Sequence, residues 1–209
     1  MIGAHYDSRN EQPCDASQAP APGANDNASG CAGVIELANA FAPVATDRSL
    51  VFACFSGEEQ GLHGSRAFVQ TLVADGRIAG VRHMVNLDMI GHAVDASLAA
   101  RAETRAEFAS WLAVYGQAAA TYAPELGLQL LQSTAAYSDH WPFLERGVPA
   151  VFTWENGASI YPHWHRSSDR PENMLRAREL ARGILRMDAA VIAELAGVWG
   201  VFADGFEAP

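Results

Sequence analysis

Short, mostly apolar runs alternate with segments of helical periodicity along the chain. These runs have the length and the bounding polar residues of buried strands. We expect strands at residues 50–55, 81–88, 128–131 and 148–153, and the end of another strand at residues 1–4. Strands that alternate with helices predict a parallel sheet with helices on both faces. We therefore expect an α/β fold of three layers, with a mostly parallel mixed sheet between two layers of helices.

The segments between the strands carry apolar residues at helical spacing. Val34, Leu37 and Phe41, for example, fall on one face of a helix. We expect helices at residues 27–41, 62–73, 103–122, 138–145 and 172–195. The helix at 138–145 begins with Ser138 and Asp139, either of which could cap it. Residues 11–25, before the first expected helix, are rich in proline and alanine, which predicts a loop.

The length and the composition fit one globular domain. A chain of 209 residues can bury a sizeable core, and its 49% apolar and 18% charged residues are ordinary values. The net charge of −10 argues against nucleic acid or an anionic membrane surface as a partner. No apolar run approaches the ~20 residues of a membrane span. We expect one domain over residues 1–198, followed by a flexible tail at residues 199–209.

The two ends of the sequence give further predictions, about missing strands at the N-terminus and about the cellular location. Residues 1–4 match the end of a buried strand with no preceding element to cover it, which predicts that the N-terminal strands of the sheet are missing. No signal peptide is visible. The tail at residues 199–209 resembles short tails of some exported bacterial proteins, which implies a secreted or periplasmic location.

The three cysteines, Cys14, Cys31 and Cys54, show no CxxC spacing. Cys54 lies in an apolar run and is expected to be a small buried hydrophobic residue. Cys14 and Cys31 could pair, but no feature of the sequence requires that disulfide. The cysteines therefore leave the cellular compartment open.

Residues of the types that bind divalent metals follow several of the expected strands. They lie in the short sequences GAHYDS (3–8), GANDNASG (23–30), SGEEQG (56–61), NLDMIG (86–91) and HRSSD (165–169). The candidate ligands are His5, Asp26, Glu59, Asp88 and His165. Sites in open α/β sheets collect at the carboxyl ends of strands. Two imidazoles and three carboxylates suffice to hold two divalent ions if one carboxylate bridges them.

Each of these residues also has an ordinary structural explanation. A lone buried histidine is more often a hydrogen-bonded core residue than a ligand, and an aspartate before a helix, such as Asp26, is a common N-cap. Adjacent glutamates such as Glu58 and Glu59 are usually surface charges. The coincidence of ligand-type residues at several strand ends favours a metal site over these separate structural roles.

Two further residues have expected roles beside the ligands. Glu58 can take a proton from water while Glu59 holds a metal, because a metal lowers the pKa of its bound water towards ~7. Asp7 lies two residues after His5, on the same side of an extended segment. It is expected to accept the second ring N–H of His5, the alternative being a loop aspartate that faces water.

These sequences resemble the co-catalytic zinc exopeptidases that include bacterial leucyl aminopeptidase, aminopeptidase S and aminopeptidase Y (metallopeptidase family twenty-eight). The resemblance runs from residue 3 to about residue 174 and includes the sequences YSDH (137–140) and GVP (147–149). It implies two Zn²⁺ ions that share one bridging carboxylate. The implied ligands are Asp26 as the bridge, Glu59 and His165 for one ion, and His5 and Asp88 for the other.

The resemblance implies roles for neighbouring residues as well. Glu58 would be the general base and proton shuttle, and the Asp26-Asn27 peptide bond would be cis, as it often is in the family. His165 fits the family pattern of a histidine followed four residues later by an aspartate, whereas His163 does not.

Other residues near these sequences have weaker indications. Tyr137 and Tyr161 are candidates to stabilise a tetrahedral oxyanion, although aromatic packing beside a loop explains them equally well. Outside the five sequences, His163 is interpreted as a pocket or surface residue, and the other histidines show no ligand spacing and are interpreted as structural. They are His63, His83, His92 and His140.

We expect a zinc-dependent exopeptidase, an aminopeptidase that removes N-terminal residues from peptides or small proteins with metal-activated water and Glu58 as the base. Cobalt or manganese can occupy sites of this kind. A glutaminyl cyclase with one zinc is an alternative, although cyclases usually alter the sequence around the bridging aspartate. A carboxypeptidase would need a basic clamp for the substrate carboxylate, which we do not identify. The alternative from another class is a non-catalytic or truncated remnant of the peptidase domain.

Overall fold

The computed structural model describes residues 1–10, 20–156 and 161–198. These residues contain a six-stranded sheet with the order β2-β1-β3-β6-β4-β5. The strands are β1 (Ile2–His5), β2 (Phe52–Phe55), β3 (Met84–Leu87), β4 (Ala99–Thr104), β5 (Gly127–Gln132) and β6 (Ala150–Glu155). The α-helices are α1 (Gly30–Phe41), α2 (His63–Ala74), α3 (Ser110–Tyr122), α4 (Trp141–Leu144) and α5 (Ala177–Ala196). Short helical turns cover Ala24–Ser29, Ile78–Gly80, Ala106–Phe108 and Pro171–Asn173.

The pairing of the strands confirms the predicted mostly parallel mixed sheet. All neighbouring strands are parallel except β6 and β4, which are antiparallel. β1 is paired on both sides, with Ile2 opposite Phe52 of β2 and Val85 of β3. Every residue of β1 is buried. The strand that ends in His5 is therefore fixed from both sides by the sheet.

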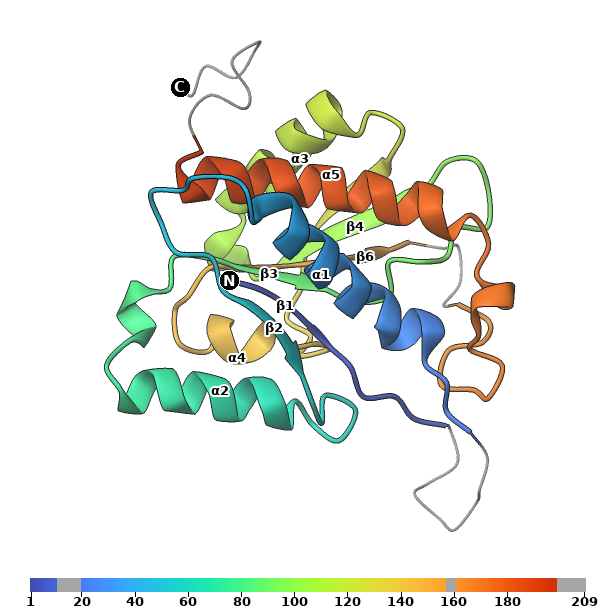
Figure 1. Ribbon diagram of the computed structural model, residues 1–209, viewed down its shortest axis with the longest axis horizontal. Helices are drawn as coiled ribbons and strands as arrows, with labels where there is room; N and C mark the ends of the chain where they lie inside the picture. The colour runs from blue at the N-terminus through green and yellow to red at the C-terminus, as the bar shows by residue number, and fades with distance from the viewer. Residues whose placement is uncertain (11–19, 157–160, 199–209) are drawn as a thin grey trace.

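Helices cover both faces of the sheet, as the alternation of elements predicts (Figure 1). α1, α3 and α5 pack on one face, and α2 and α4 pack on the other. The fold is therefore the expected three-layer arrangement. None of the described helices combines the length and the apolar character needed to cross a membrane.

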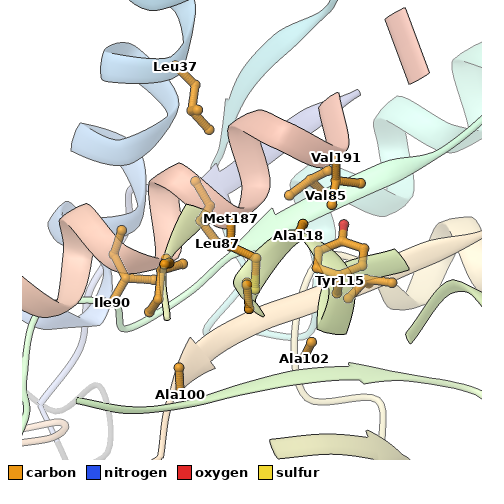
Figure 2. Packing of buried hydrophobic residues seen from close by; sticks show 14 of the residues in the cluster. Leu37, Val85, Leu87, Ile90, Ala100, Ala102, Tyr115, Ala118, Met187 and Val191 are labelled. Carbon is orange, nitrogen blue, oxygen red and sulfur yellow. The ribbon is translucent and has the colours of Figure 1, made fainter. Parts of the chain in front are cut away.

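α5 supplies much of the larger hydrophobic core. Its buried apolar residues recur every three or four positions, so they share one helical face. They include Leu180, Ile184, Met187 and Val191. Figure 2 shows Met187 and Val191 directed towards Val85 and Leu87 of β3. Each such side chain contributes roughly 1.5–3 kcal/mol when fully buried, so this face holds α5 on the sheet.

β4 contradicts the prediction of a helix that begins at residue 103. The strand extends to Thr104, and α3 begins only at Ser110. Alanine and glutamate favour helices in isolation, which explains the wrong prediction. In the folded chain Glu103 pairs with Leu131 of β5 on one side and Phe152 of β6 on the other. Pairing on both sides outweighs the local helical preference.

The remaining predicted elements are present with shifted ends. β1 extends one residue further than expected and includes His5. α1 begins at Gly30, after the Ala24–Ser29 turn, rather than directly after Asp26. The predicted capping of the helix at 138–145 is wrong, because α4 begins at Trp141 and has no side-chain cap bond. The predicted tail at 199–209 lies outside the described residues.

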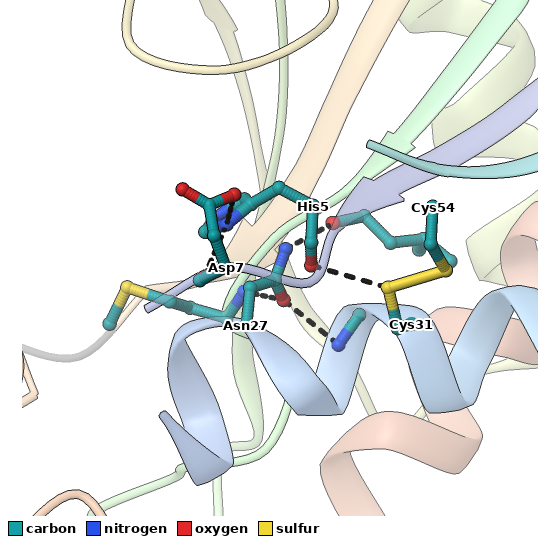
Figure 3. The surroundings of a disulfide bond; sticks show 8 residues. His5, Asp7, Asn27, Cys31 and Cys54 are labelled. Carbon is teal, nitrogen blue, oxygen red and sulfur yellow. Dashed lines mark hydrogen bonds and ion pairs between the residues drawn. A yellow bond between two sulfur atoms is a disulfide. The ribbon is translucent and has the colours of Figure 1, made fainter. Parts of the chain in front are cut away.

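A disulfide joins Cys31 of α1 to Cys54 of β2, with 6.0 Å between their Cα atoms. This pairing excludes the Cys14–Cys31 disulfide that the sequence left open, and Cys54 is exposed rather than buried. Cys14 itself lies outside the described residues. Figure 3 shows the disulfide next to the end of β1, where Sγ of Cys31 is 3.2 Å from the carbonyl oxygen of His5.

Candidate metal centre

The five predicted ligands meet at the carboxyl edge of the sheet. His5 is the last residue of β1, and Asp88 directly follows β3. Glu59 lies after β2, Asp26 between β1 and α1, and His165 in the segment after β6. Because β2, β1, β3 and β6 are consecutive parallel strands, their carboxyl ends open on the same edge.

Asp26 lies between the two candidate histidines. Its Oδ1 is 3.3 Å from Nε2 of His5, and its Oδ2 is 3.1 Å from Nε2 of His165. Oδ1 of Asp88 is 3.4 Å from the same nitrogen of His5. Oε2 of Glu59 is 3.0 Å from the same nitrogen of His165. Each oxygen of Asp26 thus faces a different pair of imidazole and carboxylate.

The side chains form two groups that could each hold a metal ion. Ligand atoms within each group lie within 4.8 Å of one another. The groups are His5, Glu58 and Asp88, and Asp26, Glu59 and His165. Within the first group, Oε2 of Glu58 is 4.0 Å from Nε2 of His5, further than the oxygens of Asp26 and Asp88. Glu58 is therefore the least engaged carboxylate around His5, which suits a base better than a ligand.

The charges of the cluster fit bound cations. Burial acts to lower the pKa of His5, but Asp88, Asp26 and Asp7 outweigh burial and raise it. Burial, then the charge of Asp88, raises the pKa of Glu58 to about 9. Among the described residues, Oε1 of Glu59 and Oδ1 of Asp88 are buried without a hydrogen-bond partner. Buried carboxylate oxygens normally have partners, and imidazole nitrogen with carboxylate oxygen is a donor set that zinc accepts.

His165 reaches the cluster and His163 does not, in agreement with the preference drawn from the sequence. Nδ1 of His163 is 2.9 Å from Oγ of Ser168, and its ring packs against Tyr161. The ring of His165 stacks on Trp164, with 3.7 Å between the ring centroids. This stacking holds the imidazole with Nε2 towards Asp26 and Glu59.

Asp7 supports the site in a different way from the one expected. Nδ1 of His5 is 3.0 Å from the backbone carbonyl oxygen of Asp7, whereas the nearest Asp7 carboxylate oxygen is 3.6 Å away. The carboxylate accepts the backbone N–H groups of Glu58 and Glu59, at 3.1 and 3.2 Å. Asp7, drawn beside His5 in Figure 3, therefore connects the end of β1 to both glutamates.

The sequence did not predict how Asp88 is oriented. Oγ of Ser138 donates a hydrogen bond to Oδ2 of Asp88, at 2.7 Å. The same hydroxyl accepts a hydrogen bond from Nδ2 of Asn86, at 2.8 Å. Because Ser138 binds Oδ2, the other oxygen of Asp88, Oδ1, faces His5. The sequence indicates Ser138 only as a possible helix cap, and the one signal for its contact with Asp88 is its place in the sequence YSDH.

Asparagines on both sides of Asp26 fix its segment. Nδ2 of Asn25 donates to both carboxylate oxygens of Glu155, at 3.0 and 3.1 Å. Nδ2 of Asn27 donates to the carbonyl oxygen of Leu87, at 3.0 Å. The Asp26-Asn27 peptide bond is cis, as the resemblance implied. The segment is therefore bonded to β6 and to the end of β3.

Arg9 places a positive charge beside the cluster, which the sequence motifs did not indicate. Its Nε donates to Nδ1 of His165 at 3.1 Å and is 3.6 Å from Oε2 of Glu59. The side chain is 46% exposed. A partly exposed guanidinium group thus lies beside His165 and Glu59.

The two candidate tyrosines differ in position. Tyr137 is 71% exposed and, within the described residues, makes no hydrogen bond to the cluster. Tyr161 is buried and packs against the rings of His92 and His163. Neither position adds support to an oxyanion role.

The fold and the cluster together define an α/β domain with a candidate metal centre at the carboxyl edge of its sheet. The chain belongs to peptidase family M28, whose family model matches residues 1–187. Aminopeptidase YwaD of Bacillus subtilis is 29% identical over 182 residues, covering 85% of this chain and 37% of YwaD. A probable zinc metalloprotease of Pyrenophora tritici-repentis is 46% identical over 92 residues, which cover 44% of this chain and 20% of the fungal protein.

Solved structures agree with this family. The zinc aminopeptidase BSAP of Bacillus subtilis matches with a TM-score of 0.77 and 27% identity, covering 93% of this chain and 45% of BSAP. Glutaminyl cyclase of Macrostomum lignano matches with a TM-score of 0.75 and 19% identity, covering 96% of this chain and 69% of the cyclase, a similarity of fold alone. The chain spans less than half the length of the fungal metalloprotease, of YwaD and of BSAP.

Proposed function

We propose that this chain carries the catalytic centre of a zinc-dependent aminopeptidase that removes N-terminal residues from peptides or small proteins. The observation that carries the proposal is the position of Asp26 between two imidazole–carboxylate pairs, with Glu58 beside them. Membership of peptidase family M28 and similarity to proteins named as aminopeptidases and zinc metalloproteases support the reaction and the metal.

We propose two zinc ions. His5 and Asp88 would hold one, Glu59 and His165 would hold the other, and Asp26 would bind both through its two oxygens. The separation of the two pairs on opposite sides of Asp26 favours two ions over the single zinc of the cyclase alternative. Bound zinc lowers the pKa of water towards ~7 and polarises a substrate carbonyl.

Glu58 would transfer the proton during hydrolysis. As the oxygen of water attacks the carbonyl carbon, the carboxylate of Glu58 takes a proton from that water. When the carbon–nitrogen bond breaks, Glu58 gives the proton to the nitrogen of the leaving peptide. The pKa of about 9 that burial and Asp88 give Glu58 would fall beside divalent ions, because positive charge favours the carboxylate.

The test compares amino-acid anilides and short peptides with their N-acetylated forms, in the presence and absence of a chelator. We expect release of the N-terminal residue from free substrates only, and loss of that release with chelator until zinc is returned. Cleavage of N-acetylated peptides from the C-terminus would contradict the proposal and favour a carboxypeptidase. Arg9 would then be the first candidate for a carboxylate clamp, because its guanidinium lies at the site.

We also propose that the protein works in an oxidising compartment, secreted or periplasmic. The Cys31–Cys54 disulfide supports this location, because disulfides persist mainly outside the cytosol. Fractionation of source cells tests it: the protein is expected in the medium or the periplasm, and recovery with the cytosolic fraction would contradict it.

A further inference from the structure

Asp169 is a buried carboxylate that the proposed chemistry does not use. The residue is 2% exposed. Oδ1 accepts the backbone N–H of Asn25 at 2.8 Å, and Oδ2 accepts the backbone N–H of Asp26 at 3.0 Å. The carbonyl oxygen of Asp169 accepts a third backbone N–H, that of Ala24, at 3.2 Å. Three consecutive amide groups that lead into Asp26 are thus bonded to one residue.

Asp169 belongs to the same short turn as the ligand His165. The backbone N–H of Asp169 donates to the carbonyl oxygen of Arg166 at 2.9 Å, which closes that turn. The turn therefore presents His165 to Oδ2 of Asp26 while Asp169 holds the backbone of Asp26. A change in one of these contacts would move the other, since both belong to one turn.

We propose that Asp169 is a positioning residue for the metal centre: by binding the amides of Asn25 and Asp26, it fixes the Asp26 carboxylate between His5 and His165. This inference rests on the proposed function, because it takes Asp26 to be the shared metal ligand. Asp169 touches neither the metals nor the substrate in this proposal. Its effect passes through the backbone of Asp26.

The substitution Asp169→Asn tests the inference with little change in size. One carboxylate oxygen becomes an amide NH₂ group. This group is a donor, so it cannot accept the hydrogen bond from the backbone N–H that it faces. We expect the folded variant to bind zinc about 10–100-fold more weakly than the wild type, the range typical for residues that orient metal ligands. Titration of the metal-free full chain with Zn²⁺ measures this affinity. Substitution with Co²⁺ adds a visible spectrum, which should change if the ligands around Asp26 move.

Asp75→Asn is the matched control, because Asp75 is an exposed aspartate paired with Arg77. It should leave zinc affinity and the Co²⁺ spectrum unchanged. If Asp169→Asn does not fold, Asp169→Glu keeps the charge and both oxygens, and an affinity below that of the wild type is again expected. Wild-type zinc affinity and an unchanged Co²⁺ spectrum in either folded variant would overturn the inference. The titration needs no peptide, so absent peptidase activity would count against the proposed function alone.

Discussion

Glu58 and Glu59 are neighbours in the sequence, yet their carboxylates have different surroundings. Asp7 accepts the backbone N–H of each residue and so fixes both at the end of β2. Oε2 of Glu59 is 3.0 Å from Nε2 of His165, whereas the nearest oxygen of Glu58 is 4.0 Å from His5. The closer carboxylate suits a metal ligand, and the more distant one remains available for proton transfer.

Replacing each glutamate by glutamine should separate these two roles. Glu58→Gln keeps the size of the side chain but removes the base, so we expect kcat to fall by about 10²–10⁴-fold while the zinc content stays at the wild-type level. Glu59→Gln, the matched variant, should lose bound zinc. Steady-state kinetics and metal analysis of both proteins check this prediction. Substantial turnover in Glu58→Gln would remove Glu58 from the role of base.

The five residues of the cluster could be predicted from the sequence because each lies in a short local pattern after a predicted strand or in a loop. The residues that orient them could not. Ser138 reaches Asp88 across 50 positions, and Asp169 reaches Asn25 across 144. Such contacts depend on how the loops fold over the sheet edge, and a single sequence does not state that. The geometric difference between the backbone and side-chain contacts of Asp7 is likewise invisible in sequence spacing.

At the scale of elements, strands with apolar residues on both faces were predictable and β4 was not. Its sequence AARAET has no valine, isoleucine or aromatic residue, and Thr104 is its one β-branched residue. β4 is a strand because β6 and β5 pair with it on both sides. The turn around Asp26 could not be predicted from local sequence either, because hydrogen bonds from the side chains of Asn25 and Asn27 to other elements fix it.

The disulfide between α1 and β2 should stabilise the fold. It closes a loop between residues 23 positions apart, for which about 3 kcal/mol is expected. Cys54→Ser should lower the free energy of unfolding by that amount in denaturant titration. Addition of a thiol reductant should destabilise the wild type and leave Cys54→Ser unchanged. Equal stability of wild type and variant would show that the link contributes nothing.

His83 should make the stability of the fold depend on pH. The residue is buried just before β3, its Nε2 is 3.1 Å from the hydroxyl oxygen of Tyr115 in α3, and burial lowers its pKa to about 3. Below about pH 6.5 the unfolded chain therefore binds a proton that the folded chain rejects. The free energy of unfolding should fall with decreasing pH, by up to ~1.4 kcal/mol per unit.

Denaturant titrations between about pH 7 and pH 4.5 measure this slope. His83→Gln, which cannot be protonated in this range, should reduce the slope, whereas the same substitution at the exposed His63 should not. An unchanged slope in His83→Gln would contradict the assignment to His83. His140, whose pKa burial also lowers to about 3, should account for part of the remaining slope.

In the whole molecule, the order of the strands explains how the residues of the candidate metal centre come together. β1 and β3 are adjacent, so His5 and Asp88 meet without a long loop. β2 and β6 flank them and bring the glutamates and His165 to the same edge from either side. The sheet thus gathers residues separated by up to 160 positions, from His5 to His165, around Asp26. The alternation of strands and helices predicted that the site lies at this edge of the sheet. The distances between the clustered side chains could be obtained only from the structure.

In the proposed centre Asp26 binds two metal ions at once. Zinc content per chain tests this sharing and is measured by elemental analysis after equilibration with Zn²⁺ and removal of loosely bound metal. The proposed centre predicts two zinc ions in the wild type. Replacement of Asp26 by alanine should weaken the binding of both ions, because each oxygen of Asp26 faces a different histidine. A single zinc ion per wild-type chain, or two that are retained without Asp26, would contradict the shared centre.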